Sequence, residues 1–88
     1  MSAEVKIYTR AFCGYCTAAL SMLKSKGVKY EEIDTGSKPE IRKWLAQETG
    51  QSTVPQIFID GKSIGGFTDM RALDDRGKLD TMLAGTAT

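Results

Sequence analysis

The sequence predicts a single α/β domain over residues 1–88. Short β-type runs alternate with segments whose apolar residues recur at helical spacing. Two of these runs flank an Asp-Gly dipeptide, which is typical of a β-hairpin. The length of 88 residues is sufficient for one hydrophobic core and too short for two. The sequence contains no repeat, low-complexity tract or linker that would indicate a second domain.

The first half of the chain is expected to form a β–α–β unit. Residues 5–8 are a short β-type run that leads directly into a segment with two cysteines. A helix face then follows at the spacing i, i+3, i+4, i+7, formed by Cys16, Ala19, Leu20 and Leu23. Gly27 ends this helix. Residues 30–34 predict a second strand, parallel to the first because a helix connects the two.

A second helix is expected to end at Gly50. Residues 37–40 match a capping box, although Pro39 disfavours helical angles at the residue before it and leaves the first helical residue open. Ile41, Trp44 and Leu45 form the apolar stripe of this helix. We therefore expect Trp44 to lie in the core.

The last part of the chain predicts a hairpin followed by a helix. Residues 56–59 and 62–64 form two short strands around the Asp-Gly turn. Thr68 is the expected cap of a final helical stretch, which continues after Gly77. The tail from Gly85 is small and polar, and we expect it to be frayed.

The composition excludes several classes of function. The net charge is +1, and charged residues of both signs make up 26% of the chain, which argues against electrostatic binding of nucleic acid or of an anionic membrane. No apolar run approaches the length that spans a bilayer. Histidine, the commonest metal ligand and general base, is absent. With no export signal and only two cysteines, a cytoplasmic protein is expected.

The cysteines of Phe-Cys-Gly-Tyr-Cys are the best candidates for chemistry. A disulfide between Cys13 and Cys16 closes almost no loop, so it would stabilise the fold little. Cys13 lies where a strand ends and a helix begins, so helix-end amides and the nearby Arg10 favour its thiolate form. Cys16 shares the apolar helix face and should be more enclosed. We therefore expect Cys13 to attack disulfides and Cys16 to resolve the mixed disulfide.

Two other interpretations of the pair are open. The cysteines could be half of a zinc site, but the chain has no further cysteine and no histidine to complete four ligands, so carboxylates or a second chain would be needed. They could also be incidental residues on a helix face. The strand–Cys-x-x-Cys–helix context favours redox chemistry over both.

Three separated motifs make the sequence similar to the glutaredoxin family. They are residues 7–10 leading into Cys-Gly-Tyr-Cys, the Thr-Val-Pro segment in residues 53–59, and the Gly-Gly-x-x-Asp turn in residues 64–69. The resemblance covers residue 5 to about residue 83. It implies a thioredoxin-like fold, in which a four-stranded mixed sheet is flanked by three or more helices, and a glutathione-dependent enzyme that reduces protein disulfides and glutathione mixed disulfides.

The resemblance also implies a set of glutathione-binding residues. Pro55 is similar to the cis-proline of the family, and a cis bond would aim the backbone of Val54 at an extended peptide. Glutathione carries two carboxylates, one for the helix start at Thr68 and Asp69 and the other for Arg10 and Arg42. The complete implied set is Arg10, Tyr15, Arg42, Thr53, Val54, Pro55, Gly66, Thr68 and Asp69.

Several of these residues also have a purely structural interpretation. Thr53 and Pro55 could form no more than a turn before a strand. Asp69 could be a favourable charge in the first turn of a helix. Arg42 could lie on a solvated helix face.

Gly14 departs from the commonest dithiol loop of the family, which has proline between the cysteines. In the family, loops with glycine here include some that hold a two-iron, two-sulfur cluster between two chains through the first cysteine of each, which would be Cys13. A cluster-binding carrier protein is therefore the alternative function, with a cluster-bridged dimer in place of the expected monomer. A thioredoxin-like protein reduced by a flavoenzyme is a further rival. The expected partners are glutathione and disulfide-containing or glutathionylated proteins.

Overall fold

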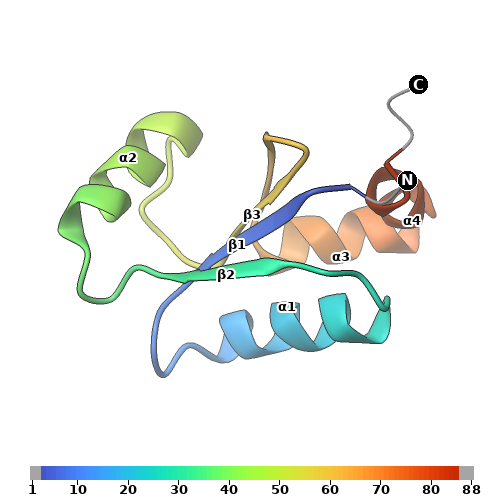
Figure 1. Ribbon diagram of the computed structural model, residues 1–88, viewed down its shortest axis with the longest axis horizontal. Helices are drawn as coiled ribbons and strands as arrows, with labels where there is room; N and C mark the ends of the chain where they lie inside the picture. The colour runs from blue at the N-terminus through green and yellow to red at the C-terminus, as the bar shows by residue number, and fades with distance from the viewer. Residues whose placement is uncertain (1–2, 86–88) are drawn as a thin grey trace.

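The computed structural model describes residues 3–85 and contains a four-stranded sheet and four helices (Figure 1). The elements, in chain order, are β1 (Val5–Thr9), α1 (Gly14–Ser25), β2 (Glu31–Asp34), α2 (Pro39–Thr49), β3 (Gln56–Ile59), β4 (Lys62–Gly65), α3 (Phe67–Asp75) and α4 (Lys78–Leu83). This order confirms the predicted α/β architecture. The end of the predicted frayed tail, residues 86–88, lies outside the described residues.

The sheet is mixed, with strand order β2-β1-β3-β4. β1 pairs in parallel with β2, as the intervening helix predicted, and antiparallel with β3. β3 and β4 form the predicted hairpin, with Asp60 and Gly61 at its turn, both at positive φ. β1 and β3 are therefore the two central strands, and the chain leaves β1 directly into the cysteine segment.

The hydrophobic core lies between the sheet and one layer of helices. α1 and α3 lie side by side on the same face of the sheet in Figure 1, and residues of α4 join the same buried cluster. Ile7 and Ile57 are paired across β1 and β3 and are fully buried, as are Leu23 of α1 and Met70 of α3. The alternation of buried and half-buried residues along β1 follows from this one-sided packing.

The opposite face of the sheet is covered at one end by α2 (Figure 1). The ring of Trp44 stacks on Phe58 with a centroid distance of 5.8 Å and also contacts Tyr8. Trp44 is nevertheless 41% exposed. The prediction that Trp44 lies in the core is therefore wrong: its stripe faces a single sheet surface, and Leu45 is the buried residue of this helix.

The helix ends also differ from the sequence prediction. The residue before α2 is Lys38, which makes no side-chain cap, so the capping box is absent and Pro39 begins the helix. α3 begins at Phe67 after Gly66, and Thr68 is therefore not its cap. At Gly77 the backbone is left-handed, which separates α3 from α4 instead of continuing one helix.

A charged cluster ties the end of α1 to α3 and α4. The Lys26 amine forms ion pairs with Asp74 and Asp80. Hydrogen bonding to Asp74, followed by that to Asp80, raises the pKa of Lys26 above its ordinary value. The cluster thus links elements that enclose the core at the end distant from the cysteines. Within residues 3–85, none of the helices has both the length and the hydropathy needed to cross a bilayer.

The burial of α1 predicts a graded response to truncation. Leu23 is fully buried, whereas Leu20 on the same helix is half-buried against the core. Leu23→Ala should lower the free energy of unfolding by about 2–5 kcal/mol because it leaves a cavity, and Leu20→Ala should cost less. Urea denaturation of both variants measures the difference. Equal losses would contradict the packing described here.

Candidate active site

Cys13 occupies the N-cap position of α1. Its backbone is extended, with φ −112° and ψ 108°, and its Sγ accepts a hydrogen bond from the backbone N–H of Cys16 at 3.2 Å. This N–H is one of the donors that a helix leaves unpaired at its start. The sulfur therefore lies at the positive end of the helix, where it faces the N–H groups of the first turn. This is the location that the sequence predicted.

Cys16 lies one turn further along, inside the protein. It is only 3% exposed, whereas Cys13 is partly exposed, and both are free thiols. Burial, and then hydrogen bonding to Cys13, raises the pKa of the Cys16 thiol to about 12. These effects are larger than those of the Arg10 backbone hydrogen bond and the Arg10 charge, which lower this pKa. Cys16 is therefore a protonated, enclosed thiol near neutral pH, as expected for a resolving cysteine.

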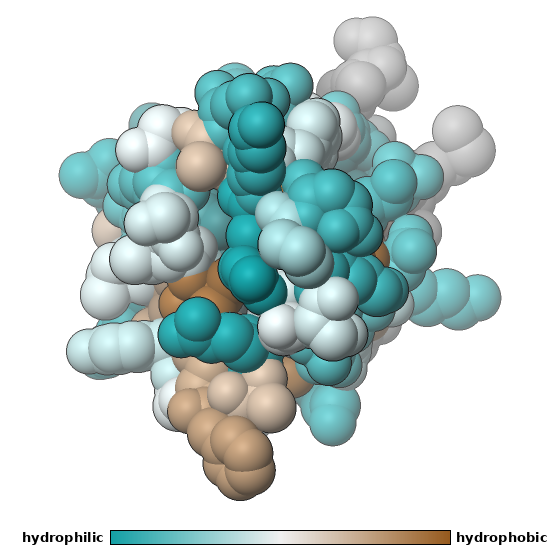
Figure 2. All heavy atoms as spheres, turned by 90° about the vertical axis from the view of Figure 1, so that its left-hand side faces the viewer, coloured by the Kyte–Doolittle hydropathy of each residue, from teal (hydrophilic) through white to brown (hydrophobic). Residues whose placement is uncertain are grey.

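The residue before Cys13, Phe12, combines a left-handed backbone with a fully exposed aromatic side chain. Phe12 has a positive φ of 58° and is completely exposed, and Tyr15 is 64% exposed. Figure 2 shows a mostly hydrophilic surface with one hydrophobic protrusion at its lower edge. The exposure of Phe12, just before Cys13, and of Tyr15, in the first turn of α1, shows that neither ring is buried over the cysteine loop, and Cys13 is partly exposed.

The segment before β3 approaches the cysteine loop. The peptide bond between Val54 and Pro55 is cis, as the resemblance implied. The Val54 carbonyl oxygen lies 3.7 Å from Cys13 Sγ, within the range of a hydrogen bond from a thiol. Pro55 is buried, while Val54 is half-buried at the surface. This segment and Cys13 therefore lie together, although 41 residues separate them in the chain.

Two glycines bring the start of α3 against the same segment. Gly65 has a φ of 97°, and a Cβ there would collide with the carboxylate of Asp69. A Cβ on Gly66 would lie 3.3 Å from the Pro55 carbonyl oxygen. The Gly66 N–H donates to Asp69 Oδ2 at 3.0 Å. The close approach of β4, α3 and the Pro55 segment therefore requires residues without side chains.

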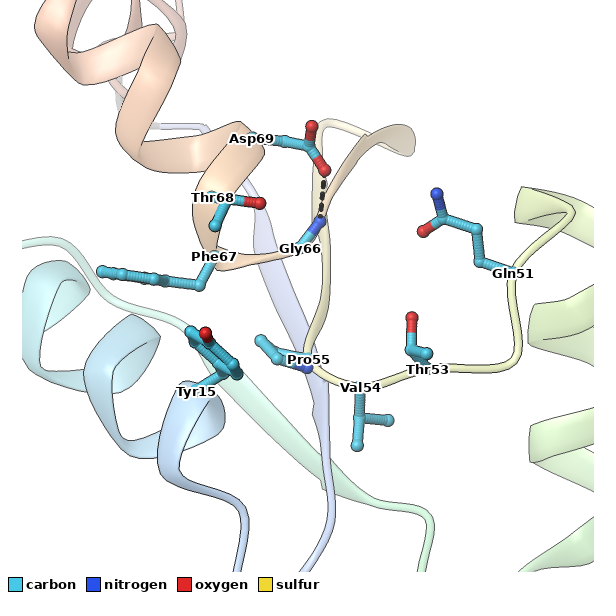
Figure 3. Close-up of a pocket in the computed structure, with 9 residues that line it drawn as sticks. All are labelled: Tyr15, Gln51, Thr53, Val54, Pro55, Gly66, Phe67, Thr68 and Asp69. Atoms are coloured by element: carbon cyan, nitrogen blue, oxygen red, sulfur yellow. Dashed lines mark hydrogen bonds between the residues drawn. The ribbon is translucent and has the colours of Figure 1, made fainter.

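These segments enclose a groove of about 420 Å³ (Figure 3). Seven predicted site residues line it: Tyr15, Thr53, Val54, Pro55, Gly66, Thr68 and Asp69. In Figure 3, Pro55 and Tyr15 lie at one end, and the start of α3 forms one wall. The groove leads from the cysteine loop to the first turn of α3, where backbone N–H groups are available to an anion.

The two predicted arginines are not among the residues that line this groove. Arg42 Nη1 donates to the carbonyl oxygens of Thr35 and Gly36 at 2.7 and 2.8 Å, so its guanidinium holds the loop between β2 and α2. The side chain of Arg10 is exposed and runs beside the same loop at Gly36. Their predicted contact with a ligand carboxylate stays a prediction.

Sequence reasoning missed two residues of the groove. Phe67 packs beside Tyr15, with ring centroids 6.3 Å apart, and Gln51 lies on the opposite side (Figure 3). Phe67 lies at one of the two unspecified positions of the Gly-Gly-x-x-Asp motif and was not predicted to bind, and Gln51 belongs to none of the motifs. The turn signals at Gly50 and Gly66 could have indicated that their neighbours lie at the surface, but not that they share one groove.

The described residues contain no cluster of side chains that could bind a metal ion. Between residues 3 and 85 no group of three or more His, Cys, Asp or Glu side chains is placed to hold one. A zinc site formed by the cysteine pair within this part of the chain therefore has no further ligands.

An accessible thiol at the start of the first helix, with an enclosed thiol one turn later, is how the thioredoxin-like fold presents a pair for thiol–disulfide exchange. Comparison with known proteins narrows this class. The glutaredoxin family model matches residues 5–64. A Glutaredoxin of Pseudomonas aeruginosa is 48% identical over 91% of this chain and 95% of its own length, and Glutaredoxin 3 of Escherichia coli is 46% identical over 92% and 98%.

Solved structures agree with these sequence matches. The crystal structure of a buckwheat glutaredoxin–glutathione complex has a TM-score of 0.88 at 33% identity, covering 92% of this chain and 76% of that one. The solution structure of a glutaredoxin from Brucella melitensis has a TM-score of 0.87 at 41% identity, covering 99% and 95%. The chain belongs to the glutaredoxin family, and thiol–disulfide exchange is the activity that the family supports.

The raised pKa of Cys16 predicts a pH-dependent stability. In the unfolded chain this thiol titrates near its ordinary value of 9.0, whereas in the folded chain it keeps its proton up to about 12. Between these values the unfolded state binds fewer protons, so the free energy of unfolding falls as pH rises, by up to about 1.4 kcal/mol per pH unit.

Urea denaturation of the reduced protein between about pH 8 and about pH 10.5 tests this linkage. The matched control is Cys16→Ala, which lacks the buried thiol and should lose less stability over the same interval. Parallel pH profiles for the two proteins would show that Cys16 is not held in its protonated form by the fold.

Proposed function

We propose that this protein is a glutathione-dependent oxidoreductase that reduces glutathione mixed disulfides and protein disulfides. The observation that carries the proposal is the position of Cys13 Sγ, 3.7 Å from the Val54 carbonyl oxygen and beside the groove that ends at the first turn of α3. The groove offers an extended backbone at one end and helix-end amides with a carboxylate at the other. A relative of this fold from buckwheat was crystallised as a complex with glutathione.

The chemistry of glutathione matches these groups. A short extended peptide can pair with the exposed backbone of Val54 in the manner of an added strand. Its α-carboxylate suits the N–H groups at Phe67 and Thr68, which open α3. Its α-amine suits the carboxylate of Asp69, which the hydrogen bond from Gly66 holds in place. Bound in this way, the glutathione sulfur comes next to Cys13.

Deglutathionylation then follows in two exchanges. The Cys13 thiolate attacks the glutathione sulfur of a mixed disulfide, a new S–S bond forms between them, and the target protein leaves as a thiolate that takes a proton from water. A second glutathione thiolate attacks the glutathione sulfur of this adduct. Oxidised glutathione leaves and the Cys13 thiolate is restored. The sum of the two exchanges is one mixed disulfide and one glutathione thiol giving the target thiol and oxidised glutathione, so the target sulfur is reduced and the sulfur of the incoming glutathione is oxidised.

Protein disulfides require Cys16. Cys13 attacks one sulfur of the target, and Cys16 then attacks Cys13 to release the reduced target and leave a Cys13–Cys16 disulfide. Once Cys13 is in a mixed disulfide, its sulfur can no longer bear a negative charge or share a thiol hydrogen bond with Cys16. Two of the causes that raise the pKa of Cys16 are then removed, and burial remains. The resolving thiol thus becomes easier to ionise when it is needed.

The alternative of a two-iron, two-sulfur carrier has less support. Cys13 is an accessible thiol that could ligate a cluster, and a Cβ at Gly14 would meet open space, so a second group could approach the loop. Among the described residues no group of three or more possible metal ligands is placed together, so glutathione and a second chain would have to complete the cluster. The same groove and thiol explain catalysis without these additions.

Serine substitutions separate the roles of the two cysteines. Cys13→Ser should abolish turnover of a glutathionylated peptide, because the attacking sulfur is lost. Cys16→Ser should keep this activity and lose direct reduction of protein disulfides, which needs the second thiol. Kinetics with glutathione and glutathione reductase measure both reactions. Equal loss of deglutathionylation in the two variants would show that the roles are misassigned.

A further inference from the structure

A buried amide lies behind the groove and is bonded in an unusual way. The side chain of Gln56 is fully buried, and its Nε2 donates to the Thr53 carbonyl oxygen at 2.9 Å and to Gln51 Oε1 at 3.0 Å. Its own Oε1 is buried with no hydrogen-bond partner. Buried polar atoms are nearly always paired, so this side chain keeps an unfavourable orientation in which both of its N–H groups serve the loop before β3.

This bonding fixes which way the amide of Gln51 faces. The Thr53 carbonyl can only accept, so the atom of Gln56 that faces it is the nitrogen. The same nitrogen donates its other hydrogen to Gln51, so the Gln51 atom on that side is the oxygen. The NH₂ group of Gln51 is therefore the part of its amide that remains to donate elsewhere.

The backbone of Gln51 is held as firmly as its side chain. Its N–H donates to Thr49 Oγ1 at 3.1 Å, and this hydroxyl in turn donates to the Leu45 carbonyl oxygen at 2.7 Å. Gly50, in a left-handed conformation with φ 71°, ends α2 just before it. The exposed side-chain amide of Gln51 is thus held in place by its own hydrogen-bonded backbone and by its hydrogen bond to the fully buried Gln56.

Gln51 lies across the groove from the start of α3. Figure 3 shows its side chain on the wall opposite Gly66 and Asp69, with Thr53 below it. This is the end of the groove where α3 offers backbone N–H groups. A carboxylate bound there would have amide donors on one side, and the Gln51 NH₂ would be the donor on the other.

We propose that Gln51 is a specificity-determining residue for the γ-glutamyl end of glutathione, held in its donating orientation by Gln56. This inference rests on the proposed function, because it concerns the ligand that the groove takes. Gln51 donates to the α-carboxylate of the γ-glutamyl group, which the first turn of α3 receives from the opposite side. Gln56 acts through Gln51 and is a positioning residue.

A pair of mixed disulfides isolates this contact. One joins a peptide cysteine to glutathione, and the other joins the same peptide to cysteinylglycine, which lacks the γ-glutamyl group. All proteins carry Cys16→Ser, so that Cys13 stops at the adduct with the small thiol and releases the peptide thiol. The rate of peptide release gives one second-order rate constant for each substrate, and their ratio measures discrimination.

Gln51→Ala should lower the ratio of the glutathione rate constant to the cysteinylglycine rate constant by about threefold to tenfold, the effect of one hydrogen bond. Only the reaction with the glutathione substrate should become slower. Gln56→Met, which fills the same space without donors, should lower the ratio similarly, and the double variant should show no further loss. The control is Gln47→Ala, an exposed glutamine of α2 outside the groove, which should leave the ratio unchanged.

The remaining outcomes separate the two proposals. The reference, or parent protein, is the Cys16→Ser protein without further changes. If this protein prefers the glutathione substrate and Gln51→Ala keeps the full preference, the role of Gln51 is wrong and the proposed function stands. The same conclusion follows if Gln47→Ala lowers the preference as much as Gln51→Ala does. A normal ratio in Gln56→Met would refute the positioning role. If the parent protein does not discriminate between the two substrates, glutathione dependence itself fails, and the role of Gln51 fails with it.

Discussion

The start of α1 at Gly14 is the constraint on which the site depends. It places Cys13 outside the helix, where its sulfur accepts the Cys16 N–H at 3.2 Å, and it places Cys16 on the helix face that packs into the core. Two identical side chains three residues apart thereby acquire opposite properties. One is accessible and bonded to a helix-end amide, and the other is buried with a pKa raised to about 12. This difference supports the proposed roles, in which Cys13 attacks and Cys16 resolves the mixed disulfide.

The parts of the fold that could be predicted from the sequence are those governed by local spacing. Helical periodicity from Cys16 and the Asp-Gly turn before β4 each involve a few neighbouring residues. The environment of Trp44 could not be predicted in this way. Whether the stripe of α2 is enclosed depends on how much of the sheet lies opposite, and the ring instead packs one-sidedly on Phe58. The cap of α3 was also predicted wrongly: the residue before this helix is Gly66, which lies against the Pro55 carbonyl oxygen, a contact that no local pattern indicates.

The same division applies to the site. Thr53, Thr68 and Asp69 were predicted through motifs, and they line one groove because glycines allow the two segments that flank the β3–β4 hairpin to approach closely. Gln51 belongs to no such motif, and its amide acquires a direction only from Gln56, whose burial no local pattern reveals. Its involvement could be recognised only once the hydrogen bonds of the folded chain were traced.

Alkylation of the reduced protein tests the difference in accessibility and reactivity between Cys13 and Cys16 most directly. A limiting amount of iodoacetamide is added near neutral pH, and the labelled residue is identified by mass spectrometry of peptides. The arrangement at the start of α1 predicts that the label is on Cys13 and that Cys16 reacts only after unfolding. Labelling of Cys16 in the folded protein, at a rate equal to or above that of Cys13, would contradict this account.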